Sequence, residues 1–199
     1  MARATSGREA GGVAVPTGKK RIETASLPTP IGTLGLYAIA GRLCAVTFEG
    51  GEDRTLLALE RRFGPVELER VPDPAGALSR LRDYFSGDLA ALDTIEVETG
   101  GTAFQRRVWE ALRRIPAGRT LAYSELAEGI GARSAVRAVG AANGRNPVPV
   151  VIPCHRVVAA DGTLWGYGGG LERKRWLLEH EGVLRPNPGD PAQRRLSFE

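Results

Sequence analysis

Two adjacent glycines, Gly100 and Gly101, divide this 199-residue chain into two parts that differ in pattern and in charge. A capping box follows at once over residues 102–105, with a hydroxyl before the first helical turn and an amide three residues later. A chain of this length holds one large domain or two small ones. The break therefore predicts an N-terminal domain over residues 21–99 and a C-terminal domain over residues 100–185.

The two ends of the chain are expected to be flexible tails, a basic one over residues 1–20 and a second over residues 186–199. The first tail lacks the apolar segment of a secretory signal, and no apolar run approaches the roughly 18 residues of a membrane span. The only cysteines are Cys44 and Cys154, which favours a reducing, cytoplasmic compartment. These cysteines and two histidines are too few and too scattered for a structural zinc site, so no metal or cofactor is expected.

The first part of the chain has the pattern of a small α/β domain. Residues 33–39 and 43–48 read as two strands joined by a glycine-containing turn, which predicts a hairpin. Residues 55–63 and 78–85 carry apolar side chains at helical spacing. Cys44 lies within a predicted strand and is interpreted as a small buried hydrophobic residue.

The second part is predicted to be mainly helical, which makes the whole chain α+β. The helix that begins after Thr102 ends at a proline and glycine near residues 115–118. Residues 123–130 and 134–143 then form two short helices around a glycine-bearing turn. This arrangement is typical of a helix-turn-helix, although many helical hairpins look the same.

Charge is distributed unevenly between the two parts. Residues 22–99 hold seven Arg or Lys against thirteen Asp or Glu, and residues 104–185 hold thirteen against seven. The first part therefore carries a formal charge of −6 and the second of +6. A basic part beside an acidic one indicates that only the second part meets a polyanion. A solvated basic surface explains the charge alone equally well.

The second short helix consists almost entirely of small residues, with Arg137 as its long side chain. A helix that reads bases in the major groove presents several long polar side chains. Small residues instead allow the close approach that the narrower minor groove requires. A tightly packed internal helix also explains the alanines, but it leaves Arg137 awkward to bury.

The segment richest in chemistry is residues 146–158, NPVPVVIPCHRVV. It places Cys154 at the end of a predicted apolar strand, directly before His155 and Arg156. Cationic neighbours lower the pKa of a thiol, and the thiolate is the nucleophilic form. Taken by itself, a Cys-His pair could equally be a buried and inert cysteine.

This segment resembles the active-site motif of the 6-O-alkylguanine-DNA alkyltransferases. The resemblance runs in order through residues 102–182, and several motifs in register make it specific. The other matching segments are residues 104–109, 115–123, 137–140, 146–147, 166–171 and 176–182.

The resemblance implies irreversible transfer of the alkyl group from 6-O-methylguanine in DNA to Cys154, in a single turnover. Displacement at an alkyl carbon needs a strong nucleophile, and the thioether product cannot be hydrolysed, so the protein is consumed. By the same resemblance His155 takes the thiol proton through a water, and Glu181 orients His155 as in a catalytic triad. Tyr123 protonates the leaving guanine, and Asn146 braces the turn near the nucleophile.

The family's target base is buried in duplex DNA, so the resemblance also implies base flipping. Arg137 would fill the vacated stack while Tyr123 crowds the backbone, with the protein bound to double-stranded DNA through the minor groove. A monomer is expected, and cooperative binding is left open. The other residues implied at the DNA are Ser134, Ala135, Ala138 and Gly140, and those implied around the flipped base are Val157, Tyr167, Gly168 and Gly169.

The family also implies a fold with a small ribonuclease H-like N-terminal domain and a winged helix-turn-helix C-terminal domain. Ala122 departs from the pattern, because many members have Ser there and its hydroxyl cap is lost. At Gly168 some members have Ser; the backbone N–H that would bind oxygen-6 survives. Whether 4-O-methylthymine is also a substrate stays open.

Three alternatives explain parts of the sequence. A non-catalytic alkyltransferase-like lesion binder would share the fold and Arg137, but it would carry another residue in place of Cys154. A cysteine hydrolase built on Cys154, His155 and Glu181 leaves the basic half unexplained, and adjacent Cys and His side chains diverge. A transcription regulator with a helix-turn-helix would give the segment around Cys154 no role.

Overall fold

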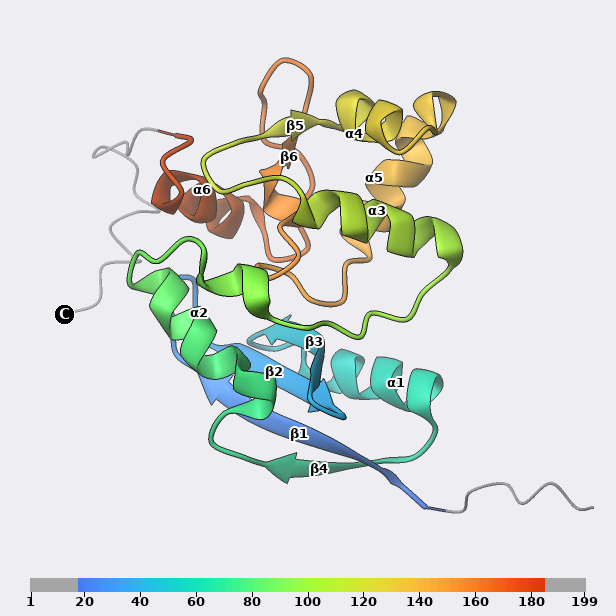
Figure 1. The fold of residues 1–199 in the computed structure, drawn as a ribbon, viewed down its shortest axis with the longest axis vertical. Coiled ribbons are helices and arrows are strands. Elements are labelled where there is room, and N and C mark those ends of the chain that lie inside the picture. The colour runs from blue at the N-terminus through green and yellow to red at the C-terminus, as the bar shows by residue number, and fades with distance from the viewer. Residues whose placement is uncertain (1–17, 185–199) are drawn as a thin grey trace, which may run out of the picture.

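The computed structural model describes residues 18–184 (Figure 1). These residues form a mixed α+β fold with two parts that follow one another along the chain. A four-stranded sheet with two helices makes up the first part. The remaining helices and a two-stranded sheet make up the second. The α+β class is therefore confirmed. Of the expected tails at residues 1–20 and 186–199, residues 1–17 and the whole second tail lie outside the described residues, while Lys20 already begins a strand.

The sheet of the first part has the strand order β3-β2-β1-β4. Its strands are β1 (Lys20–Leu27), β2 (Leu34–Ile39), β3 (Arg42–Phe48) and β4 (Val66–Arg70). The predicted hairpin is confirmed as the antiparallel pair β2–β3, while β4 runs parallel to β1. The sequence analysis missed β1 and β4, because β4 is short and largely exposed and β1 does not alternate cleanly between apolar and polar residues.

Helices α1 (Glu52–Phe63) and α2 (Ala77–Phe85) cover opposite faces of this sheet. Leu59 of α1 packs with Tyr37 of β2 in one buried cluster. Leu36, next to Tyr37 on the same strand, belongs to the other cluster together with residues of α2. This separation follows from the alternation of side chains along a strand. Both helices were predicted, although α1 begins three residues earlier than expected.

The second part begins at the predicted capping box. Thr102 Oγ1 accepts from the Gln105 N–H at 3.2 Å, and Gln105 Oε1 accepts from the Thr102 N–H at 2.9 Å. The helices are α3 (Ala103–Arg113), α4 (Tyr123–Gly129), α5 (Val136–Gly144) and α6 (Leu171–His180), and β5 (Leu121–Ala122) pairs in parallel with β6 (Val157–Val158). Short 3-10 turns lie at Pro74–Gly76, Ala91–Thr94, Arg133–Ala135 and Cys154–Arg156.

One expected helix is confirmed with a later start, and one local expectation is wrong. The predicted helix over residues 134–143 is α5, which begins at Val136 after the 3-10 turn Arg133–Ala135. The predicted apolar strand before Cys154 is a series of turns, and Cys154 itself begins the 3-10 turn Cys154–Arg156. Prolines at three positions of this segment, 147, 149 and 153, cannot donate to a strand ladder, and Val150 has a φ of 75°.

The two parts share one hydrophobic core. A single cluster of buried side chains contains Leu36 and Leu81 from the first part and Leu112 and Leu177 from the second. The backbone N–H of Val46 also donates to the carbonyl of residue 147 at 2.9 Å. Side chains on the second part are therefore positioned directly by the sheet of the first. Across residues 18–184, no helix combines the length and the apolar character needed to cross a membrane.

Candidate active site

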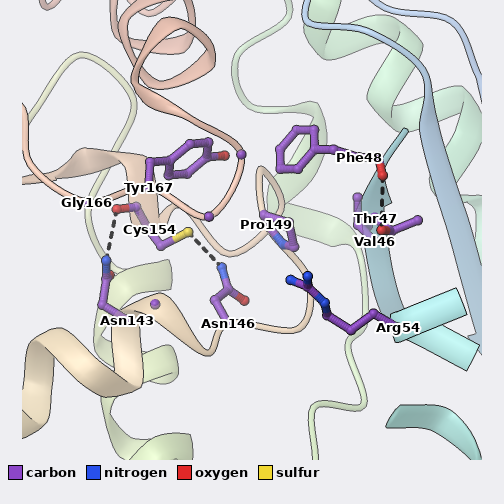
Figure 2. A pocket seen from close by; sticks show the side chains of 13 residues that line it. Val46, Thr47, Phe48, Arg54, Asn143, Asn146, Pro149, Cys154, Gly166 and Tyr167 are labelled. Carbon is purple, nitrogen blue, oxygen red and sulfur yellow. Dashed lines mark hydrogen bonds between the residues drawn. The ribbon is translucent and has the colours of Figure 1, made fainter. Parts of the chain in front are cut away.

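A cavity of about 200 Å³ lies where the two parts meet, and the Cys154 thiol lines it (Figure 2). One wall comes from the end of β3, including Phe48, and from Arg54 of α1. The opposite wall comes from Asn143 of α5 and from residues 166–169, the loop before α6. Cys154 is only 5% exposed, so a substrate reaches its sulfur through this cavity.

Asn146 fixes the position of the thiol. Its Nδ2 group donates to Cys154 Sγ at 3.1 Å and to the Ile152 carbonyl at 2.7 Å. Its Oδ1 atom accepts from the Val148 N–H at 3.0 Å. All three contacts hold the turn that carries Cys154, as Figure 2 shows for the bond to the sulfur. The Asn146 amide can therefore both brace this turn and stabilise a thiolate.

Burial raises the pKa of the Cys154 thiol to about 11. The hydrogen bond from Asn146 and the charge of Lys174 both act to lower this pKa, but burial outweighs them. Lys174 is fully buried on α6 and donates to the carbonyls of Val157 and Trp165, each at 2.7 Å. Burial lowers the pKa of Lys174 to about 8, and the proximity of Cys154 opposes that change. The sequence analysis named His155 and Arg156 as the cations beside the thiol, but Lys174 supplies this charge.

Behind the thiol, four hydrogen bonds converge on the buried Glu181 carboxylate. His155 Nε2 lies 2.9 Å from Oε1, and the Tyr84 hydroxyl donates to the same oxygen at 2.8 Å. Arg156 makes a bidentate contact, with Nε donating to Oε2 and Nη2 to Oε1, both at 2.8 Å. The Arg156 guanidinium, two residues after Cys154 in the sequence, thus pairs with Glu181 and also donates to the Ile115 carbonyl.

The charges in this cluster are set by burial and by close pairing. Burial disfavours the charged form of Glu181, but the hydrogen bonds and charges of His155 and Arg156 outweigh it and hold the pKa of Glu181 at about 2. Burial lowers the pKa of His155 below its usual value, although Glu181 opposes this. His155 is therefore neutral at pH 7, and its Nδ1 atom has no hydrogen-bond partner among residues 18–184. A neutral imidazole with a free ring nitrogen can accept a proton.

The residues expected at the DNA lie on α4, on α5 and on the turn between them. Arg137, Ser134 and Ala138 are exposed, while Ala135 and Gly140 are half-buried. α5 thus has an exposed face, and the awkward burial of Arg137 does not arise. Tyr123 is half-buried at the start of α4, and a Cβ at Gly140 would meet its ring at 3.8 Å. The Tyr123 ring therefore lies beside Gly140, and an alanine Cβ there would make an ordinary van der Waals contact with it.

The N-cap of α4 departs from a complete capping box. Ala122 has no side-chain acceptor, and only the Glu125 carboxylate, which accepts from the Ala122 N–H at 2.6 Å, caps the first turn. The hydroxyl cap that the sequence analysis noted as lost is indeed missing at this position.

The residues expected around the base separate into two groups. Tyr167, Gly168 and Gly169 line the cavity, whereas Val157 is fully buried in β6 and its carbonyl accepts from Lys174. A Cβ at Gly169 would lie 2.6 Å from the Phe48 ring, so only glycine fits there without movement. A Cβ at Gly168 would meet nothing within 4 Å.

Comparison with known proteins assigns the chain to a family. The family model described as "6-O-methylguanine DNA methyltransferase, DNA binding domain" matches residues 103–183. The methylated-DNA–protein-cysteine methyltransferase of Salmonella typhimurium is 47% identical over 167 residues, which cover 82% of this chain and 98% of that protein. The chain belongs to the methylated-DNA–protein-cysteine methyltransferase family.

Solved structures of this methyltransferase family share the fold. Mycobacterium tuberculosis OGT in complex with DNA has a TM-score of 0.68 and 38% identity, and the match covers 88% of this chain and 98% of that one. The 6-O-methylguanine-DNA methyltransferase of Pyrococcus kodakaraensis has a TM-score of 0.58 and 29% identity, with 81% of this chain covered.

Sequence reasoning missed several residues of this methyltransferase site. Tyr84 lies 97 residues from Glu181 along the chain, and no local pattern indicates that the two meet. Arg54 and Phe48 reach the cavity from the first part for the same reason. Lys174 sits among other basic residues of α6, where a buried lysine cannot be told from an exposed one. Asn143 follows a run of small residues and was not singled out.

Proposed function

We propose that this chain repairs DNA by direct reversal, transferring the alkyl group of 6-O-methylguanine to its own Cys154 once and irreversibly. The observation that carries the proposal is the Cys154 thiol, which lines a cavity and is held at 3.1 Å by Asn146 in a chain of this family. The cavity gives an electrophile access to the sulfur. Transfer of the methyl group of 4-O-methylthymine to Cys154 is a second reaction that we propose for the same site.

The proton of the Cys154 thiol passes to His155, through a water, since no hydrogen bond joins the two side chains among the described residues. His155 is neutral before the reaction and becomes an imidazolium next to the Glu181 carboxylate, which stabilises it. The thiolate forms a bond to the alkyl carbon as the bond from this carbon to oxygen-6 breaks. The leaving guanine anion takes a proton from Tyr123.

DNA binding is assigned to α4 and α5 as a helix-turn-helix that enters the minor groove. The exposed side chain of Arg137 supports a role in filling the stack after the base flips out, and the small residues Ala138 and Gly140 support a close approach. The parallel pair β5–β6 would form part of the wing of a winged helix-turn-helix domain over residues 100–185.

Residues 21–99 form the N-terminal domain in this proposal, with a ribonuclease H-like arrangement of sheet and helices. The protein acts as a monomer on double-stranded DNA. Both cysteines are free thiols, and a nucleophilic Cys154 must stay reduced, which supports a cytoplasmic location.

The experiment is the intact mass of the protein after incubation with duplex DNA that carries 6-O-methylguanine. One added methyl group on wild type, located on Cys154 by peptide mapping, is the expected result. Cys154→Ala should bind the same DNA and gain no mass, while Cys44→Ala should react as wild type does. An unmodified wild type that still binds the lesion would identify a non-catalytic lesion binder instead, and methyl transfer to Cys44 would overturn the assignment of Cys154.

A further inference from the structure

Asn143 is a buried polar residue for which the mechanism above has no use. It lies near the end of α5, is 2% exposed and lines the cavity beside Cys154 (Figure 2). Its Nδ2 group donates to the Cys154 carbonyl at 3.4 Å. Asn143 lies three residues after Gly140 on α5, where a Cβ would meet the Tyr123 ring at 3.8 Å, and a side-chain hydrogen bond from Asn143 lowers the pKa of Tyr123. Its Oδ1 atom is buried and has no partner among residues 18–184.

A residue that served only to fill space here would be apolar. Burying an amide with one unsatisfied oxygen costs free energy, and a leucine of similar size would avoid that cost. The amide touches the backbone of the nucleophile and the side chain of the proton donor, which come from different elements. These contacts therefore indicate that Asn143 has a role in the reaction and does not serve only to pack α5.

We propose that Asn143 is a positioning residue that acts through Tyr123, donating its Nδ2 hydrogen to the Tyr123 hydroxyl oxygen. An oxygen that accepts this hydrogen bond is free to direct its own proton toward the cavity, where the leaving guanine lies. This inference rests on the proposed function, and it adds how the proton donor of that reaction is aimed and stabilised.

The chemical step shows why such a donor matters. As sulfur bonds to the alkyl carbon, the electron pair of the carbon–oxygen bond moves to oxygen-6 and the guanine becomes an anion. The Tyr123 proton passes to this anion, so Tyr123 is left as a phenolate. Burial and the nearby Cys154 both raise the pKa of Tyr123, whereas the Asn143 hydrogen bond lowers it. Asn143 thus favours the proton transfer by stabilising the phenolate.

The test is a double-mutant cycle in single-turnover methyl transfer from duplex DNA. Asn143→Leu removes the donor at nearly constant size, and it should lower the limiting rate about tenfold, as expected for a hydrogen bond to a charged group. The DNA concentration at half-saturation should stay unchanged. If Asn143 acts through the Tyr123 hydroxyl, then Asn143→Leu combined with Tyr123→Phe should be no slower than Tyr123→Phe alone.

Val139→Ala is the matched control. Val139 is fully buried on the same helix but does not line the cavity, so the variant should lower the melting temperature and keep the limiting rate. Asn143→Asp is the second variant, used also if Asn143→Leu does not fold. Its carboxylate would accept the Tyr123 proton and turn it away from the guanine, so transfer should be slower still.

Three results would overturn the inference. These are rate losses that simply multiply in the double variant, a Tyr123→Phe variant as fast as wild type, and an Asn143→Asp variant as fast as wild type. Failure of the proposed function is distinguishable, since wild type itself would then gain no methyl group.

Discussion

At the scale of single residues, Glu181 determines the state of the groups behind the thiol. Its carboxylate accepts from His155, Arg156 and Tyr84, so it joins a 3-10 turn, α2 and the end of α6. The bidentate Arg156 contact neutralises its charge and fixes its orientation. Glu181 can therefore orient His155 without movement during the reaction.

Glu181→Gln should slow methyl transfer roughly a hundredfold, because the general base that we propose, His155, loses its charged partner. DNA affinity should be nearly unchanged, since Glu181 is buried and away from the exposed face of α5. Single-turnover rates and lesion-binding isotherms measure the two effects separately. A variant that reacts as fast as wild type would leave Glu181 with a purely structural role.

Acid should destabilise the protein through the same residue. The pKa of Glu181 is about 2 in the folded protein and 4.5 for an ordinary glutamate, so its stabilisation is fully present above about pH 4.5 and is lost as the pH falls towards 2. The shift corresponds to roughly 3 kcal/mol at most. Urea unfolding between pH 7 and pH 3 should show a steeper loss of stability in wild type than in Glu181→Gln. Parallel curves would contradict this assignment.

At the scale of elements, α5 allows the proposed base flipping to be tested apart from the chemistry. Arg137 lies on its exposed face, away from the cavity that holds Cys154. Arg137→Ala should therefore slow repair of duplex DNA far more than reaction with free 6-O-methylguanine, which needs no extrusion. Arg80→Ala, which removes an exposed guanidinium from α2, is the control and should affect neither substrate. Equal losses on both substrates would assign Arg137 to the fold or the pocket.

The loop before α6 tolerates a side chain at one glycine and not at the next. Gly168→Ser should keep activity, because its Cβ meets nothing within 4 Å and its N–H is retained. Gly169→Ala should lower the transfer rate, because its Cβ would lie 2.6 Å from the Phe48 ring and displace the cavity wall. Transfer rates, with melting curves as a check of folding, compare the two variants. Similar behaviour of both would mean that the loop adapts freely.

Gly168→Pro tests the backbone donor itself, since proline removes the N–H. A well-folded Gly168→Pro variant that reacts as fast as wild type would place the contact with oxygen-6 elsewhere.

At the scale of the whole molecule, the two parts depend on one another. Their shared core holds Leu36 and Leu177 in one cluster, and Tyr84 of the first part bonds to Glu181 of the second. Residues 100–184 expressed alone should therefore unfold at a much lower temperature and transfer methyl groups slowly or not at all. Circular dichroism melts and the intact-mass assay measure these effects. An isolated fragment as stable and active as the full chain would show that the shared core is dispensable.

The sequence by itself determined the parts of this protein that depend on near neighbours. The capping box at Thr102, the β2–β3 hairpin and the helices α1, α2, α3 and α4 follow from local hydrogen bonding and from the spacing of apolar residues. The motif around Cys154 indicated the family, because the order of several short segments is a property of the sequence alone.

Only the tertiary structure decided which charges face the thiol. Lys174 and Arg156 are both basic residues near the motif, yet Lys174 approaches Cys154 while Arg156 pairs with Glu181. Tyr84 and Asn143 became candidates for the same reason, since their partners lie on other elements. Hydrogen bonds and burial act over a few ångströms in space, and the separation of residues along the chain does not reveal those distances.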